Sequence, residues 1–131
     1  MMTFYQREID RIRDLYYSNG KQLDAVIGAR YFIVNNFDQE LNLDVLAHIC
    51  FISKFHFLRI FKKYYGQTPK QYLTETRIEK SKENLKRGMS ITETSFAVGF
   101  ESPNSFSTLF KSRTGLTPTD FQKRATFTMS I

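Results

Sequence analysis

The hydrophobic residues along this chain recur with the spacing of helices. Apolar positions return every three to four residues through most of the sequence, and no stretch shows the strict alternation of a half-buried strand. The pattern predicts an all-α fold with about seven helices and a last turn or helix after Pro118. The helices are expected at about residues 3–18, 21–36, 43–50, 54–65, 69–87, 91–98 and 103–113.

Apolar stripes mark the first two predicted helices. In the first helix the stripe has heptad-like spacing with charges between its members, which are Tyr5, Ile9, Ile12 and Tyr16. In the second helix it follows one face, through Leu23, Val26, Ile27, Tyr31 and Val34. The first stripe could pair two chains or dock a partner. We expect it to pack on its own domain, because stripes of this kind more often do.

Capping residues indicate where helices begin and end. All three prolines follow a hydroxyl residue, which matches an N-cap followed by proline at the first helical position: Thr68–Pro69, Ser102–Pro103 and Thr117–Pro118. Asn42 is a further candidate N-cap. Glycine favours the left-handed conformation of a helix C-cap, so helices are expected to stop at Gly20, Gly66, Gly88 and Gly115.

Part of the sequence occurs twice. A set of matched residues returns after a constant 49 positions, so the match is a register and not a scatter of common residues. Phe61–Lys62, Gly66, Thr68–Pro69 and Tyr72 correspond to Phe110–Lys111, Gly115, Thr117–Pro118 and Phe121. Each copy holds a helix end, a glycine stop and the next helix start. The repeat therefore predicts one helix-turn-helix unit used twice.

Composition and the lack of certain motifs limit the functions that this chain can have. A chain of 131 residues with 41% hydrophobic residues can bury one or two modest cores, and its net charge of +6 favours an anionic partner. No apolar run approaches a membrane span and no signal peptide is evident, so we expect a soluble cytoplasmic protein. Cys50 is the single cysteine and His48 and His56 lack ligand spacing, which argues against a metal site. We expect no cofactor and no enzymatic activity, because phosphate loops, nucleophile elbows and acid pairs are lacking.

Several of these residues together resemble the DNA-binding domain of AraC/XylS-type bacterial transcription regulators. The resemblance covers about residues 22–122. Its most specific parts are Leu46–Ala47, Ser53 through Lys63, Gly66–Pro69 with Tyr72, Arg77–Ile78, Val98–Phe100, Ser105–Ser107, Phe110–Lys111 and Gly115–Pro118. The resemblance implies two helix-turn-helix units, joined by a connecting helix, that bind adjacent major-groove segments of one double-stranded DNA as a monomer.

The expected domain organisation follows this resemblance. It comprises an N-terminal helical extension (1–20), a first helix-turn-helix subdomain (21–68), a connector helix (69–87) and a second helix-turn-helix subdomain with a C-terminal helix (88–131). A connector of about 18 residues spans roughly 27 Å, which is comparable with the roughly 34 Å of one DNA turn once helix radii are added. A dimer through the N-terminal helix is the alternative assembly.

Helical facing then selects the side chains that can read bases. In the fourth helix the core residues leave a second face with Phe55, Leu58, Arg59 and Lys62. The equivalent face of the seventh helix has Asn104, Ser107, Thr108 and Lys111, with Pro103 at its groove-entry end. Arg59 suits guanine, Asn104 suits adenine, and Phe55 and Leu58 suit thymine methyl groups. The alternative is that Phe55 and Leu58 extend the core and Arg59 is a solvated charge.

Phosphate contacts are expected around the same helices. The candidates are Ser53, Lys54, Lys62, Lys63, Ser102, Lys111 and Arg113, together with the amides at the two capped helix starts. A single lysine is more often an ordinary solvated residue. Only the placement of these residues around two predicted recognition helices favours a role in DNA binding.

Three features of the sequence depart from the family's pattern. Phe51 stands in the first turn where the second turn has Gly99, so the first turn is expected to be built differently. Thr94 and Ser95 replace two apolar residues and should loosen the sixth helix. Thr108 replaces a longer reading side chain. We therefore expect the first unit to read sequence more strongly than the second.

The most direct interpretation is a DNA-binding transcription regulator, more often an activator in this family, that touches RNA polymerase through an unspecified surface. The chain has too few residues before the resemblance for an effector domain. It is expected to be a standalone regulator or a piece of a longer one. The alternative is a helix-turn-helix protein-interaction module with weak or nonspecific DNA binding.

Overall fold

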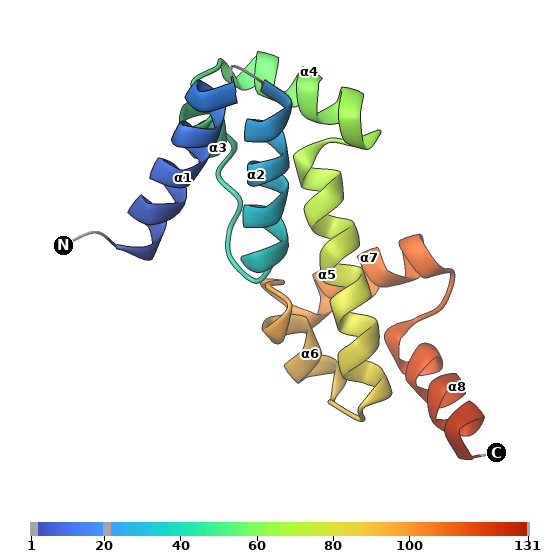
Figure 1. Cartoon of the computed structure of the whole chain (residues 1–131). Helices are drawn as coiled ribbons and strands as arrows, with labels where there is room; N and C mark the ends of the chain where they lie inside the picture. The colour runs from blue at the N-terminus through green and yellow to red at the C-terminus, as the bar shows by residue number, and fades with distance from the viewer. Residues whose placement is uncertain (1–2, 20–21, 131) are drawn as a thin grey trace. The chain divides into compact units, whose positions relative to one another are not determined.

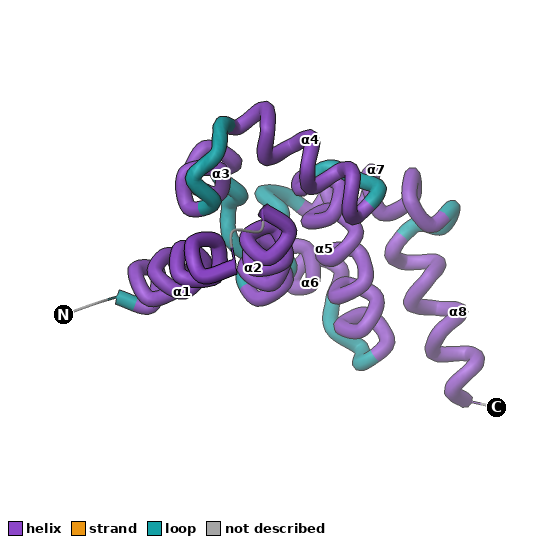
Figure 2. The backbone as a smooth tube through the Cα atoms, turned by 45° about the horizontal axis from the view of Figure 1, so that its top comes forward, coloured by secondary structure: helices purple, strands orange, loops and turns teal. Residues whose placement is uncertain are grey.

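The computed structural model describes residues 3–19 and 22–130, and the side chains of residues 3–11, 24 and 26–126. The described chain forms eight α-helices and contains no strand, which confirms the predicted all-α fold (Figures 1 and 2). The helices are α1 (Phe4–Asn19), α2 (Gln22–Asn35), α3 (Leu43–Ile49), α4 (Lys54–Tyr65), α5 (Pro69–Lys86), α6 (Ile91–Ala97), α7 (Pro103–Thr114) and α8 (Pro118–Ser130). Gly20, the predicted end of the first helix, lies outside the described residues.

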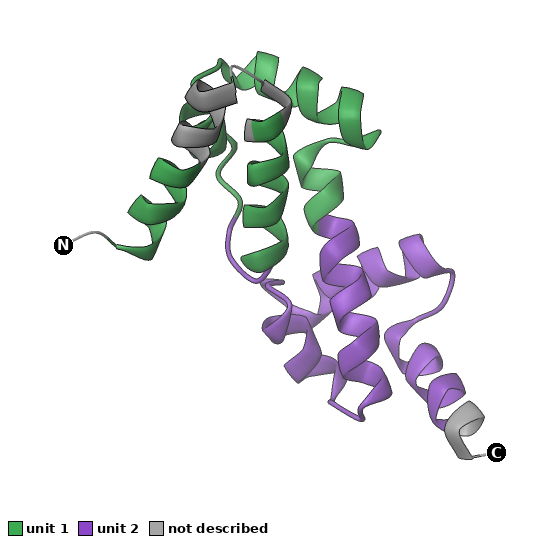
Figure 3. Cartoon of the chain, in the orientation of Figure 1, with its two compact units in different colours: residues 1–36, 41–73 green, residues 37–40, 74–131 purple. Residues whose placement is uncertain are grey.

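The chain divides into two compact units (Figure 3). Unit 1 consists of residues 1–36 and 41–73, and unit 2 consists of residues 37–40 and 74–131. Helix α5 begins in unit 1 and continues in unit 2, and the short segment 37–40 belongs to unit 2. The subdomain boundaries expected from the sequence stay predictions.

The core of unit 1 includes a ladder of aromatic rings from α4 and α5. The Phe61 ring lies 5.9 Å from the Phe57 ring, 4.7 Å from Tyr65 and 5.8 Å from Tyr72, measured between centroids. Arg30 of α2 donates a hydrogen bond from Nε to the Tyr72 hydroxyl at 2.5 Å. This bond raises the pKa of Arg30 above its ordinary value. The ladder therefore joins α2, α4 and α5 within unit 1.

The buried face of α2 differs from the predicted stripe. Val26 is fully buried as expected, but Ile27 and Tyr31 are 36% and 51% exposed. The buried face instead runs through Val26, Ala29 and Ile33. Most residues of α2 are apolar, so periodicity alone could not choose the face that packs on α1 and α4. The Leu23 side chain lies outside the described residues.

Helix α1 packs on α2 through at least part of its stripe. The Tyr5 ring makes an edge contact with the ring of Phe32 at a centroid distance of 5.9 Å, and Tyr5 stays 40% exposed. The Ile12 and Tyr16 side chains lie outside the described residues. The contact supports packing of the stripe on its own domain, while a dimer through α1 stays a prediction.

The core of unit 2 repeats the aromatic contacts of unit 1. Phe106 and Phe110 lie 5.5 Å apart, as their counterparts Phe57 and Phe61 lie 5.9 Å apart. Phe110 lies 5.4 Å from Phe121 of α8. Phe121 occupies the place that Tyr72 holds in unit 1. Ile78 and Leu85 of α5 complete this cluster. The register found in the sequence is therefore a repeat of core contacts.

The two turns share two hydrogen bonds and a residue at positive φ, so the expectation that the first would be built differently at Phe51 is wrong. In the first turn, the Phe51 amide donates to the His48 carbonyl and the Ile52 amide to the Ala47 carbonyl. The second turn repeats both bonds 48 positions later, from Gly99 to Phe96 and from Phe100 to Ser95. Phe51 adopts φ +59° and Gly99 adopts φ +97°. The second turn then has one extra residue, Glu101, which restores the 49-residue register at Ser102.

Gly99 lies against an arginine clamp in unit 2. Arg77 of α5 donates from Nε to the Phe37 carbonyl at 2.6 Å and from Nη2 to the Gln39 carbonyl at 2.8 Å. Burial lowers the pKa of Arg77 below its ordinary value. A Cβ at position 99 would lie 3.0 Å from both the Arg77 guanidinium and the Asp38 Cα. The clamp holds segment 37–40, and a side chain at position 99 would need Arg77 and the Asp38 backbone to shift.

Helix α6 buries two hydroxyl side chains. Thr94 and Ser95 are both 0% exposed. The Ser95 hydroxyl donates to the Thr92 carbonyl at 2.7 Å, whereas the Thr94 hydroxyl has no hydrogen-bond partner in the structure. Leu46 and Ala47 occupy the corresponding places in α3 and are also buried. Loosening of α6 stays a prediction. The two hydroxyl residues expected to cause it are buried in the core.

Candidate nucleic-acid interface

Helix α4 is fixed at both ends and on one side. The Ser53 hydroxyl accepts the His56 amide at 3.1 Å, and the Gly66 amide donates to the Lys62 carbonyl at 2.8 Å with φ +73° at Gly66. Phe57 and Phe61 are fully buried and Ile60 nearly so. The core thereby fixes which face of α4 is available to a ligand.

The available face of α4 is apolar and cationic. Phe55 is 77% exposed, so it does not extend the core as the alternative interpretation required. Arg59 and Lys62 are exposed on the same side, and Leu58 between them is half-buried. A major groove presents acceptor atoms and thymine methyl groups, which are the partners of such side chains.

Helix α7 has the same frame with a different face. The Ser102 hydroxyl accepts the Ser105 amide at 3.1 Å, Pro103 occupies the first turn, and Gly115 closes the helix with φ +82°. Phe106 and Phe110 are fully buried. The remaining face is neutral and polar until its cationic end: Asn104, Thr108 and Lys111 are exposed, and Ser107 is half-buried.

The N-terminal ends of the two helices also differ. Helix α4 begins with Lys54 and α7 begins with Pro103. Proline has no amide proton, so α7 offers one donor fewer to a phosphate at its N-terminus. Lys54 adds a cation at the other site, with its Nζ 3.9 Å from the Asp44 carboxylate. The pair is exposed and contributes little to stability, so Lys54 stays available to an anion.

The structure places the phosphate candidates in two groups. Ser53 and Ser102 act as N-caps, so their hydroxyls already bind helix amides. Lys62, Lys63 and Lys111 are exposed in the last turns of their helices. Arg113 is different, because its Nη1 lies 2.6 Å from the Glu75 carboxylate of α5. Sequence facing did not reveal this partner, which is 38 positions away in the chain.

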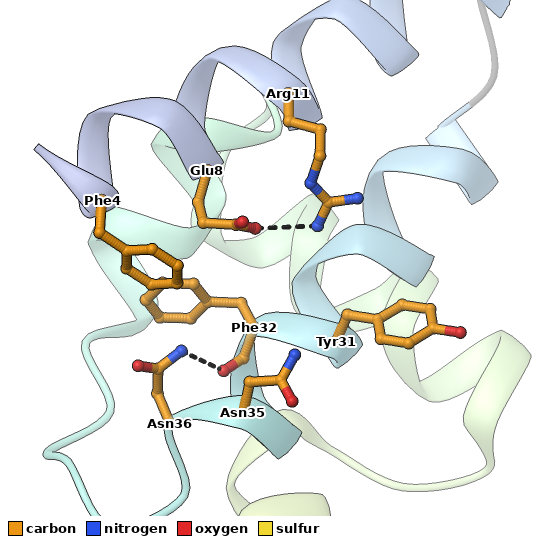
Figure 4. Close-up of a pocket in the computed structure, with 7 residues that line it drawn as sticks. All are labelled: Phe4, Glu8, Arg11, Tyr31, Phe32, Asn35 and Asn36. Atoms are coloured by element: carbon orange, nitrogen blue, oxygen red, sulfur yellow. Dashed lines mark hydrogen bonds and ion pairs between the residues drawn. The ribbon is translucent and has the colours of Figure 1, made fainter. Parts of the chain in front are cut away.

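A pocket outside these helices was also not indicated by the sequence. It lies between α1 and α2, with a volume of about 350 Å³, and Figure 4 shows its lining: Phe4, Glu8, Arg11, Tyr31, Phe32, Asn35 and Asn36. The Arg11 guanidinium lies 2.8 Å from the Glu8 carboxylate, and the Asn36 amide donates to the Phe32 carbonyl at 2.9 Å. None of the predicted DNA-contact residues lines this pocket.

Comparison with known proteins agrees with this geometry. Residues 46–124 match the model of a family described as a helix-turn-helix domain. An uncharacterized HTH-type transcriptional regulator of Pseudoalteromonas carrageenovora is 36% identical over 76% of this chain and 59% of its own length. The bifunctional transcriptional activator/DNA repair enzyme AdaA of Bacillus subtilis is 37% identical over 70% of this chain and 44% of its own length.

A solved structure shows the same fold. The C-terminal domain of AraT, a response regulator from Geobacillus stearothermophilus, superposes with a TM-score of 0.71 at 31% identity, covering 76% of this chain and 84% of that chain. The chain belongs to the AraC/XylS-type helix-turn-helix family of transcription regulators. It spans about half the length of the two curated relatives. Among the described residues, no helix combines the length and the apolar character that crossing a membrane requires.

Proposed function

We propose that this protein is a sequence-specific, double-stranded DNA-binding transcription regulator that inserts α4 and α7 into adjacent major grooves. The observation that carries the proposal is the duplicated frame: two helices, each capped by serine and glycine, bury two phenylalanines and expose the opposite face. A capped, rigid helix with a free face is what base reading requires. The net charge of +6 supports binding to a polyanion.

In this proposal the exposed faces read bases and the surrounding residues bind phosphates. The base contacts come from Phe55, Leu58 and Arg59 of α4 and from Pro103, Asn104, Ser107 and Thr108 of α7. The phosphate contacts come from Ser53, Lys54, Lys62, Lys63, Ser102, Lys111 and Arg113. Arg113 must leave or share Glu75 to reach a phosphate, so we rank it below the lysines.

Activation is the mode of regulation that we propose. The relative AdaA is described as a transcriptional activator, which supports this choice. The protein would bind DNA as a monomer in the bacterial cytoplasm and contact RNA polymerase through a surface outside the reading faces. Enzymatic activity is not part of the proposal. Burial raises the pKa of the Cys50 thiol to about 12, which disfavours the nucleophilic thiolate at neutral pH.

A selection of bound duplexes from a random DNA pool tests the proposal. The enriched duplex is then titrated by fluorescence anisotropy at several salt concentrations. We expect one motif with two parts about one helical turn apart, and a salt slope equivalent to about four to eight phosphate contacts. Without an enriched motif, and with binding lost at moderate salt, the DNA-reading function is wrong.

The second candidate function is a protein-interaction module, and the pocket between α1 and α2 is the observation that favours it. Phe4 and Tyr31 of its lining are 64% and 51% exposed, and such aromatic side chains are common in protein interfaces. The same selection separates the two candidates. An interaction module would show no sequence preference that survives nonspecific competitor DNA.

A further inference from the structure

The exposed Phe55 of α4 has no role in the folded core. It is 77% exposed, more than the other large apolar side chains among the described residues. It occupies the second position of α4, where a phenylalanine is a weaker helix former than alanine, lysine or glutamate. Folding therefore gives no reason for an aromatic ring at this position.

Its neighbours place Phe55 on the face proposed to read DNA. Arg59 lies one turn further along α4 and is exposed on the same side, and half-buried Leu58 adjoins both. Lys54 and Lys62 are exposed at the two ends of the helix. Phe55 is thus an apolar side chain with three cationic residues around it. It would bind best to a partner whose surface is anionic at its edges and apolar at one point. A protein partner would need that same unusual combination.

In the major groove of DNA, the apolar feature of the base edges is the C5 methyl group of thymine. Resting on the proposed function, we infer that α4 recognises C5 methyl groups through Phe55 and Leu58, beside the guanine that Arg59 reads. The ligand class of unit 1 is thus a half-site that contains thymine. Since 5-methylcytosine carries its methyl group at the same position, a methylated cytosine satisfies the same contact.

Helix α7 provides the internal contrast. Its matched positions are Asn104, Ser107 and Thr108, which present amide and hydroxyl groups. Such groups read bases through hydrogen bonds, and a missing methyl group leaves those bonds intact. Binding by unit 2 is therefore insensitive to the loss of C5 methyl groups, except for the small contact that the Thr108 methyl can make.

Deoxyuridine scanning tests the inference. Each thymine of the selected duplex is replaced in turn by deoxyuridine, which removes only the C5 methyl group. Burial of one CH₂ or CH₃ group contributes about 0.8 kcal/mol, so we expect affinity to fall about fourfold at each contacted thymine. In the Phe55→Ala protein, the losses at the thymines that Phe55 contacts should disappear, whereas those at thymines that Leu58 contacts should remain. The Asn104→Ala protein is the matched control and should keep the fourfold losses.

A second set of duplexes tests the methyl group on another base. A contacted thymine–adenine pair is replaced by cytosine–guanine, with cytosine either unmethylated or methylated at C5. Where the replaced thymine is one that Phe55 contacts, we expect methylation to raise affinity about fourfold for the unmodified protein and to have no effect for Phe55→Ala. Because Phe55 is exposed, its replacement leaves the core intact, and unchanged circular dichroism confirms this.

The outcomes distinguish this inference from the proposed function. If no motif is selected at all, the regulator proposal fails and this inference fails with it. If a motif is selected but no thymine substitution weakens binding, or if Phe55→Ala keeps every one of the losses, only the methyl readout is wrong. Phe55 would then be assigned to a protein contact.

Discussion

The two helix-turn-helix turns have the same hydrogen bonds, but one of them holds a large side chain at its positive-φ position and the other holds none. Both place a residue at positive φ after the first helix, which is Phe51 in one unit and Gly99 in the other. The room around the Cβ position determines which of the two residues each turn can hold. A Cβ at Gly99 would lie 3.0 Å from Arg77 and from the Asp38 backbone, whereas the first turn holds a complete phenylalanine ring that is 38% exposed. A repeated backbone therefore requires glycine only where a neighbour approaches closely.

The first helices of the two helix-turn-helix pairs, α3 and α6, also differ. Leu46 and Ala47 of α3 bury apolar side chains, and at the matched positions α6 buries Thr94 and Ser95. Unit 2 therefore forms its core with one hydroxyl that has no hydrogen-bond partner. This hydroxyl lowers the stability of unit 2 at a position where unit 1 has the apolar Leu46, because a buried polar group without a partner costs about 1–3 kcal/mol.

The largest expected effect is that of Gly99→Ala. Positive φ together with the tight contacts of the added Cβ with Arg77 and Asp38 should lower the free energy of unfolding of unit 2 by about 2–4 kcal/mol. The matched control is Gly88→Ala, with φ +90° and nothing within 4 Å of the added Cβ, which should cost only about 1 kcal/mol.

Tyrosine fluorescence assigns such losses to a unit. All seven tyrosines lie in the residue ranges of unit 1, so their emission during chemical denaturation reports that unit, while circular dichroism reports both. Gly99→Ala should shift the circular dichroism transition and leave the tyrosine transition nearly in place. Equal costs for the two alanine variants would show that space at Gly99 does not matter.

The next effect concerns DNA reading. Arg59 on α4 can make a bidentate contact with guanine, so Arg59→Ala should weaken specific binding by about 1–3 kcal/mol, or about 5- to 150-fold. Thr108→Ala on α7 removes one short side chain and should change affinity less than threefold. Anisotropy titration of the selected duplex at fixed salt measures both. Similar losses from the two variants would contradict the expectation that unit 1 reads sequence more strongly.

Much of the fold could be predicted because its signals are local. The Ser53 and Ser102 caps, the Gly66 and Gly115 stops and the phenylalanine spacing all act within one or two turns, and the predicted helix ends agree with the structure to within a few residues. The α2 face could not be predicted, since most residues there are apolar and they surround the helix. Its orientation depends on contacts with α1 and α4 that periodicity does not encode.

The sequence predicted which side of each candidate helix is exposed, but not which residues of other helices contact its side chains. The buried Phe57 and Phe61 fix the exposed side of α4, and the sequence shows this spacing directly. The ion pair of Arg113 with Glu75 depends on the packing of two helices and could not be predicted from local spacing. The prediction for the turn at Phe51 was wrong for a related reason. Sequence reveals an unfavourable φ, but the space around it is a tertiary property.

Thr94→Val should produce a smaller effect of opposite sign. The substitution keeps the side-chain shape and removes the hydroxyl that lacks a partner, so unit 2 should gain about 1 kcal/mol. Ser95→Ala is the matched control. It removes a hydroxyl that already donates to the Thr92 carbonyl, and should leave stability within about 0.5 kcal/mol. The circular dichroism transition measures both, and a destabilised Thr94→Val protein would mean that this hydroxyl is satisfied in solution.

The smallest expected effect isolates the backbone at Phe51. Phe51→Ala and Phe51→Gly both remove the ring, so the difference between them measures the cost of a Cβ at φ +59°. Tyrosine fluorescence should show Phe51→Gly more stable than Phe51→Ala by about 1 kcal/mol, which is less than the difference expected between glycine and alanine at position 99. If the two differences are equal, positive φ alone accounts for the glycine of the second turn, and the arginine clamp has no part in selecting it.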